Sequence, residues 1–120
     1  MAAQKNIVTV PLGAPSGTTV GGVLKLPNPV GQDLLVTLLA LEITTATVTA
    51  DAKLNAGIDA DGLTGSNNLI AAASAEATGI LSNLAGSKVA KWPASGFLVV
   101  TATDDVSDLV GVAHFQWAYA

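Results

Sequence analysis

The sequence predicts an all-β protein, an antiparallel jelly roll or β-sandwich of about seven or eight strands. Three observations lead to this prediction. Val and Thr, whose branched side chains suit a pleated surface, are abundant. Apolar residues alternate along several short segments. Clusters of Gly, Pro, Asp and Asn separate these segments, as expected for strands joined by turns.

The chain has 120 residues, a length that fits one domain. Residues 1–11 precede the main pattern and are predicted to be an extended N-terminal arm, and residues 12–120 a single β-sandwich domain. The arm has three possible structures: a strand added to a neighbour's sheet, a first strand of its own sheet, or a frayed terminus.

The first two strands of the domain are predicted at residues 18–26 and 33–43. Residues 18–26 alternate with period two, and Gly21-Gly22 indicates a bulge or a close backbone approach. Residues 33–43 are apolar on both faces, which is typical of a strand between two layers. Leu35, Thr37, Leu39, Leu41 and Ile43 are expected on one face, and Leu34, Val36, Leu38 and Ala40 on the other.

The middle of the chain contains one ambiguous segment. A turn near residues 44–47 leads into a predicted strand at 48–58, and residues 59–62 have turn chemistry. In residues 67–84 the apolar side chains recur at helical spacing, which allows a short helix, although Thr78 and Gly79 disfavour it. A long loop with small strands is the alternative.

The last third of the chain has clearer strand patterns. Residues 88–92 and 97–103 are predicted strands joined by a tight turn at 93–96. Residues 104–108 form an acidic loop, and residues 110–119 form the final strand. Phe115, Trp117 and Tyr119 are expected on one face of this strand, with His114 and Gln116 on the other.

The charges disfavour nucleic acid as a partner. The chain has five Lys, no Arg and nine acidic residues, for a net charge of −4. Nucleic-acid binding depends on many cationic contacts to phosphates, with Arg preferred. Only 12% of residues are charged, which indicates either a surface of neutral polar residues or one covered by neighbouring subunits. We favour the second interpretation.

No membrane partner and no export by a cleaved signal are expected. The N-terminal residues lack the apolar core of a signal peptide. The longest apolar stretch, residues 34–41, is too short to span a bilayer. Cysteine is absent, so no disulfide or thiolate metal site is expected.

The sequence contains little catalytic or metal-binding chemistry. His114 is the only histidine and lies within a predicted strand, where a structural or interface role is favoured over a catalytic triad. The acidic cluster at residues 59–62 lacks the spacing of a calcium loop and is interpreted as a turn. For the acidic loop at residues 104–108, a solvated turn is favoured over weak cation binding. We therefore expect no enzyme activity, no catalytic residue, no cofactor and no metal.

Two features suggest assembly. The N-terminal arm is one, and the concentration of three of the five aromatic residues at 115–119 is the other. These aromatic residues mark either the centre of the core or a subunit contact. The candidate contact residues are Lys5, Ile7, Val8, Val10, Trp92, His114, Phe115, Trp117 and Tyr119.

The order of elements resembles that of small jelly-roll head decoration, or cement, proteins of tailed bacteriophages. One matching stretch is residues 48–69, where a Thr/Ala-rich strand runs into GIDADG and SNNLI. The other is residues 93–119, which include ASGFLVVT and DLVGVAHF. The two stretches cover somewhat under half of the chain and consist of small-residue and strand patterns. The N-terminal region is less similar.

This resemblance implies a homotrimer on the outer capsid surface of a virion, made in the host cytoplasm, that binds the major capsid protein lattice and stabilises it. It supplies no catalytic residues. Two alternatives are a fibre, tail or baseplate component of a virion, and a carbohydrate-binding β-sandwich module. The module would need exposed aromatic residues, such as Trp92 or Trp117, in a groove.

Overall fold

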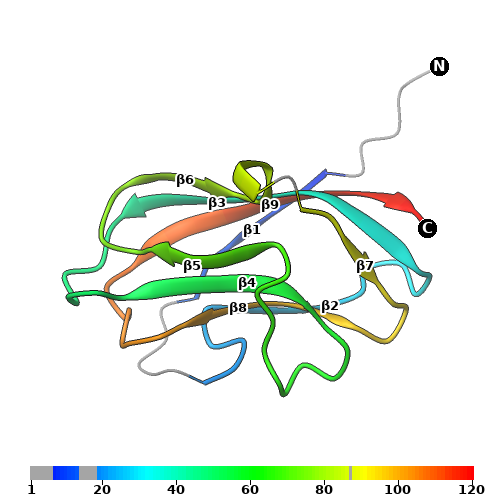
Figure 1. The fold of residues 1–120 in the computed structure, drawn as a ribbon, viewed down its shortest axis with the longest axis horizontal. Coiled ribbons are helices and arrows are strands. Elements are labelled where there is room, and N and C mark those ends of the chain that lie inside the picture. The colour runs from blue at the N-terminus through cyan, green and yellow to red at the C-terminus, as the bar shows by residue number, and fades with distance from the viewer. Residues whose placement is uncertain (1–6, 14–18, 87) are drawn as a thin grey trace.

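The protein is a two-layer β-sandwich (Figure 1). The structure, a computed structural model, describes residues 7–13, 19–86 and 88–120. These residues form nine strands and one short 3₁₀ helix. The strands are β1 (Ile7–Pro11), β2 (Leu24–Pro27), β3 (Leu34–Thr45), β4 (Lys53–Asp59), β5 (Ile70–Ser74), β6 (Gly79–Ser82), β7 (Ala90–Trp92), β8 (Phe97–Ala102) and β9 (Val110–Tyr119), and the helix η1 is Asn83–Gly86.

The strand order is that of a jelly roll. One sheet has the order β1–β9–β3–β6, and β7 also pairs with β3. The other sheet has the order β2–β8–β4–β5, and all pairings are antiparallel. The chain passes repeatedly from one sheet to the other, so each sheet is built from strands distant in sequence. The predicted all-β fold class is confirmed.

The core between the sheets is built around an aromatic cluster. The ring centroids of Trp92 and Phe115 are 5.8 Å apart, and those of Phe115 and Trp117 are also 5.8 Å apart. The indole N–H of Trp92 donates to the Gly96 carbonyl at 2.9 Å. The buried indole N–H of Trp117 has no partner among the described residues. Val, Leu, Ile and Ala fill the rest of this interior.

A β-bulge in β3 corrects the predicted faces of that strand. Leu34 and Val36 point into the core, and after an irregularity between Val36 and Leu38 the buried residues are Leu39, Leu41 and Ile43. The extra residue reverses the alternation, so the predicted grouping of Leu35 with Leu39 is wrong. The strand is central in its sheet, but its outward residues Leu35, Leu38 and Ala40 are half-buried rather than covered by a second core.

The Asn83 side chain supplies hydrogen bonds to the backbone of β3 where no strand pairs with it at this bulge. Along this side of β3, β7 pairs with residues 34–36 and β6 with residues 40–43. The Asn83 amide lies in the gap: its Oδ1 accepts from Leu39 N–H at 2.8 Å, and its Nδ2 donates to the carbonyls of Thr37 at 3.1 Å and Lys88 at 2.6 Å. One buried side chain therefore takes the place of the missing strand.

The helix allowed for residues 67–84 is wrong. This segment supplies β5 and β6, and only η1 at its end is helical. β5 pairs with β4 and β6 with β3, so the segment crosses from one sheet to the other. Gly79 has a φ of +136° and Ala72 a φ of +49°, neither of which fits an α-helix. Tertiary pairing has overridden the helical preference of the alanines.

Two other predicted strands, at 18–26 and 48–58, begin at least five residues later than expected. β2 begins at Leu24 because residues 20–22 form a turn in which Gly21 has a φ of +70°. This turn replaces the predicted bulge, and the Gly21 N–H donates to Thr101 Oγ1 at 2.9 Å. β4 begins at Lys53 because the preceding Asp51 has a φ of +62°. Residue 18 lies outside the described residues.

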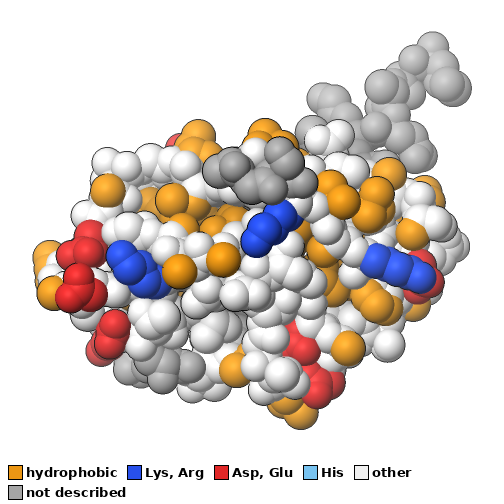
Figure 2. Space-filling view, in the orientation of Figure 1, with side chains coloured by type: hydrophobic (Ala, Val, Ile, Leu, Met, Phe, Trp, Pro, Cys, Tyr) orange, Lys and Arg blue, Asp and Glu red, His pale blue; other side chains and the backbone are white. Residues whose placement is uncertain are grey.

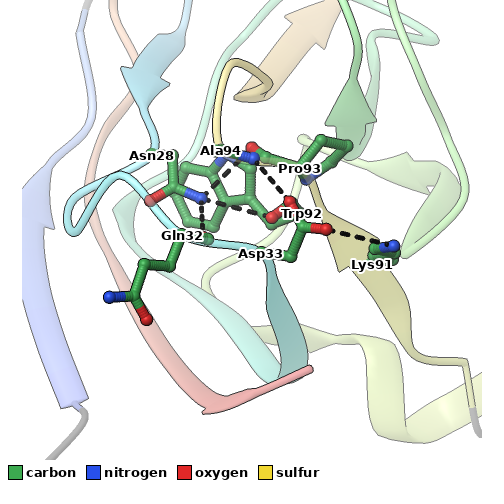
Figure 3. Close-up of polar contacts among 7 residues, drawn as sticks. All are labelled: Asn28, Gln32, Asp33, Lys91, Trp92, Pro93 and Ala94. Atoms are coloured by element: carbon green, nitrogen blue, oxygen red, sulfur yellow. Dashed lines mark hydrogen bonds and ion pairs between the residues drawn. The ribbon is translucent and has the colours of Figure 1, made fainter.

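One end of the sandwich is closed by polar side chains from the β2–β3 loop (Figure 3). Asn28 Nδ2 donates to the carbonyls of Gln32, Trp92 and Pro93, at 2.8, 3.2 and 3.1 Å. Asp33 accepts from Ala94 N–H at 3.0 Å and pairs with Lys91 at 3.2 Å. The Ala94 N–H, more than Lys91, lowers the pKa of Asp33 below its ordinary value.

The part of the predicted arm that the structure describes is a strand of the domain. β1 pairs with β9 of the same chain, from Ile7 opposite Gln116 to Pro11 opposite Val112. Of the three possible structures for this segment, the structure has the first strand of its own sheet. The first six residues lie outside the described part of the chain.

Candidate functional site

A groove with a largely apolar lining lies between β5 and β6. It has a volume of about 400 Å³. Figure 2 shows hydrophobic side chains gathered in a hollow between the positions that β6 and β5 occupy in Figure 1. The residues that line this β5–β6 groove include Leu69, Ile70, Ala73, Ile80, Leu81 and Lys88.

The groove forms because the sandwich is open along this side. β5 pairs with β4 and β6 with β3, and both are edge strands of opposite sheets. Leu69 and Ile70 are buried, whereas Ile80 on β6 is 69% exposed. The alanines of β5 are too small to fill the space between the two edges. The result is an apolar depression with a protruding apolar rim.

Two further features make this edge suited to contact another molecule. Leu84 and Val89, which lie close to β6 in sequence, are also exposed large hydrophobic residues. In addition, no described strand pairs with the outer edge of β5, so its backbone can pair with another chain. Exposed apolar side chains beside an open strand edge are a typical interaction surface.

A row of three polar side chains crosses the outer face of the β1–β9–β3–β6 sheet, from β1 over β9 to β3. Thr9 Oγ1 lies 2.8 Å from His114 Nδ1, and His114 Nε2 lies 3.1 Å from Glu42 Oε1. The row resembles a hydrolytic triad in composition. It lies on a strand whose backbone is paired on both sides, by β1 and β3, so the nearby backbone N–H groups are committed to the sheet. The arrangement ties three strands together.

The acidic residues at 59–62 form a stiff loop. Asp59 Oδ2 accepts from the N–H groups of Thr64 at 3.1 Å and Gly65 at 2.7 Å. Asp61 Oδ1 accepts from the N–H groups of Leu63 at 2.9 Å and Thr64 at 3.2 Å. The Leu63 N–H is the largest cause of a lowered pKa of Asp61. These carboxylates complete turns, as the sequence predicts.

The second acidic cluster, residues 104–108, contains a carboxylate that holds two loops together. Asp108 accepts from Thr47 Oγ1 at 2.6 Å and from Val48 N–H at 2.9 Å, and the Thr47 hydroxyl is the main cause of its lowered pKa. It therefore fastens the β8–β9 loop to the β3–β4 loop. Among the residues that the structure describes, no group of three or more His, Cys, Asp or Glu could hold a metal ion.

A shallower hollow of about 340 Å³ has a polar lining. It lies where the β4–β5 loop folds over the outer face of the β2–β8–β4–β5 sheet, beside Asn55, Ser66 and Thr101. Gly57 allows this approach, because a Cβ there would lie 2.7 Å from the backbone N of Asn68. The hollow contains no aromatic lining residue. Trp92 and Trp117, the residues that a carbohydrate-binding module would need exposed, are buried.

The predicted contact residues do not form one surface. Trp92, Phe115 and Trp117 are buried core residues, and Val8 and Val10 on β1 pack against that core. His114 is half-buried and Tyr119 is exposed at the end of β9. Ile7 belongs to β1, and Lys5 lies outside the described residues. The three buried aromatic residues are therefore not available to a partner of the folded chain.

The sequence did not predict the β5–β6 groove, because residues 67–84 allowed either a short helix or a long loop with small strands. The available signal was the pair of small apolar segments at 69–73 and 80–81, separated by Thr78-Gly79. An edge strand on each side of such a break exposes whichever apolar residues face away from the core.

Within the described residues, no helix is long and apolar enough to cross a membrane. Comparison of the chain with protein-family models, with curated proteins and with solved structures found no match.

Proposed function

We propose that this chain is a non-enzymatic structural protein that packs against copies of itself and against a larger protein assembly. The observation that carries the proposal is the β5–β6 groove with the exposed Ile80 in its lining, together with the exposed Leu84 and Val89 that follow β6 in sequence. A folded domain that leaves a groove and several large apolar side chains in water gains free energy when a partner covers them, at about 25 cal/mol per Å² of apolar surface.

The proposed assembly is the capsid of a tailed bacteriophage. The chain would decorate the outer surface of the virion as a homotrimer and bind the lattice of the major capsid protein. The jelly-roll fold is compatible with this role, and the resemblance of residues 48–69 and 93–119 to cement proteins supports it. Fold alone does not specify function, so the resemblance and the groove carry the argument.

The mechanism in this proposal is mechanical. A specific contact typically buries about 1,600 Å² in total, or about 800 Å² per partner. A contact of this size would cover a minor part of the domain's accessible surface of 5978 Å². Binding to the assembled lattice stabilises the assembled state by mass action, and repetition over the shell multiplies the effect.

Two measurements test the proposal. Light scattering of the purified chain should give a mass of about three protomers, as expected for a closed cyclic oligomer. Co-sedimentation with capsids of the virus that carries the gene should recover the protein, and image reconstruction should place it on the shell. A monomer at every concentration, absent from the particles, would overturn the proposal. If image reconstruction places the protein on the tail instead of the shell, the tail and not the capsid is the structure to which it binds.

A further inference from the structure

The β4–β5 loop presents a single exposed leucine. Leu63, in this loop, is 74% exposed. The β4–β5 loop projects at the bottom of Figure 1, and Figure 2 shows acidic and hydrophobic side chains in that part of the molecule. Its backbone N–H and that of Thr64 are held by the Asp61 carboxylate. The loop therefore keeps its shape although its apolar side chain has no place in the core.

A second contact fixes the base of the same loop. Gly62 is buried with a φ of +71°, and a Cβ added there would lie 2.9 Å from the Phe97 ring and 2.7 Å from Lys25 Cε. Lys25 in turn lies over the Phe97 ring, 5.1 Å from its centroid. Because the loop is seated on this ring, little conformational entropy remains to be lost when Leu63 binds a partner.

The loop and the groove have complementary charges. Asp61 stands beside Leu63 and forms no ion pair within the described part of the chain. Lys88 lines the β5–β6 groove and likewise forms no ion pair with any described residue. One surface thus offers an apolar side chain beside a negative charge, and the other offers an apolar depression beside a positive charge.

We propose that Leu63 of one copy enters the β5–β6 groove of a second copy, with Asp61 near Lys88. This inference rests on the proposed function, since it names the surfaces through which copies associate. The contact is head-to-tail: every copy uses its loop on one neighbour and its groove on another. Contacts of this kind close into a ring when the rotation between copies permits, so a small cyclic oligomer follows.

The absence of cysteine from the chain permits a direct test by disulfide crosslinking. Leu63→Cys and Ile80→Cys are made as separate full-length variants, mixed in equal amounts, and oxidised. The proposal places these two side chains together, so the mixture should give at least about tenfold more disulfide-linked dimer than either variant gives alone. Mass spectrometry under non-reducing conditions identifies the linked pair.

Val48→Cys provides the matched control. Val48 is also a loop residue, 91% exposed, and the proposal gives it no partner. Val48→Cys mixed with Ile80→Cys should therefore crosslink only at the background rate. Thermal unfolding of each reduced variant checks that the exposed substitution leaves the fold intact.

The possible outcomes separate the inference from the proposed function. Preferential linkage of position 63 to position 80 supports the inference. If Ile80→Cys alone crosslinks most, the copies meet edge to edge and the inference is wrong. If the wild-type chain is oligomeric but no pair exceeds the Val48 control, the inference is wrong while the proposed self-association stands. If the wild-type chain is a monomer at every concentration, the inference and the proposed self-association are both wrong, and binding to the particles is tested separately by co-sedimentation.

Discussion

Asn83 is the single residue on which the geometry of β3 most depends. Its side chain is only 1% exposed and makes three hydrogen bonds to backbone groups at the bulge. An alanine there would leave the Leu39 N–H and the Thr37 carbonyl without partners in a buried position.

We expect Asn83→Ala to lower the free energy of unfolding by about 3 kcal/mol, because buried backbone groups lose their partners. Urea denaturation measures the change. Asn67→Ala is the control, since Asn67 is exposed, and its effect should stay within about 0.5 kcal/mol. Equal effects of the two substitutions would show that Asn83 does not support the bulge.

Three aspartates make the stability depend on pH. Hydrogen bonds to the Ala94 N–H, the Leu63 N–H and the Thr47 hydroxyl hold the pKa values of Asp33, Asp61 and Asp108 below the ordinary value of 3.8. A carboxyl group with a lowered folded-state pKa stabilises the protein above its unfolded pKa, and that contribution is lost as the pH falls through the folded-state value.

The urea midpoint should therefore be nearly constant from neutral pH to about pH 5 and should fall below about pH 4. Asp108→Asn should show a smaller fall than wild type, because one of the three titrating groups is gone. A stability that rises on acidification would contradict these assignments.

At the scale of elements, the Thr9–His114–Glu42 row joins β1 to β9 and β3. The His114–Glu42 pair is partly exposed. Partly exposed pairs of this kind contribute little to stability.

We expect His114→Ala to lower the free energy of unfolding by no more than about 1 kcal/mol and to leave the oligomeric state unchanged. Chemical denaturation and light scattering check the two parts. A variant that folds normally but no longer self-associates would instead place His114 at a contact between copies.

The elements show which parts of the fold the sequence could predict. β9 was predicted with its observed bounds, because alternation runs through residues 110–119 without interruption. The faces of β3 could not be assigned, since the bulge at Thr37 depends on Asn83, distant in sequence. Residues 67–84 were ambiguous because their alanines suit a helix, and only pairing with β4 and β3 decides the structure.

The candidate site was less predictable than the fold. The groove needs edge strands of two sheets to come together, which is a property of the topology rather than of a local pattern. The sequence did indicate a surface suited to association, but three of the aromatic residues it pointed to, Trp92, Phe115 and Trp117, lie in the core. In an aromatic-poor chain the largest side chains fill the interior first.

At the scale of the whole molecule, the account depends on the apolar edge formed by β5 and β6. The two sheets share a core centred on Trp92 and Phe115, and the groove lies where that core reaches the surface. A charge placed on the rim should disrupt association without disturbing the fold, since Ile80 is largely exposed.

The most direct test of the β5–β6 groove as the association surface is sedimentation velocity. It compares the wild-type chain with Ile80→Glu over a range of concentrations. We expect the wild-type chain to sediment as an oligomer, and the variant to sediment as a monomer with an unchanged unfolding transition. An oligomer of the same size and stability for both proteins would contradict the assignment of the groove as the association surface.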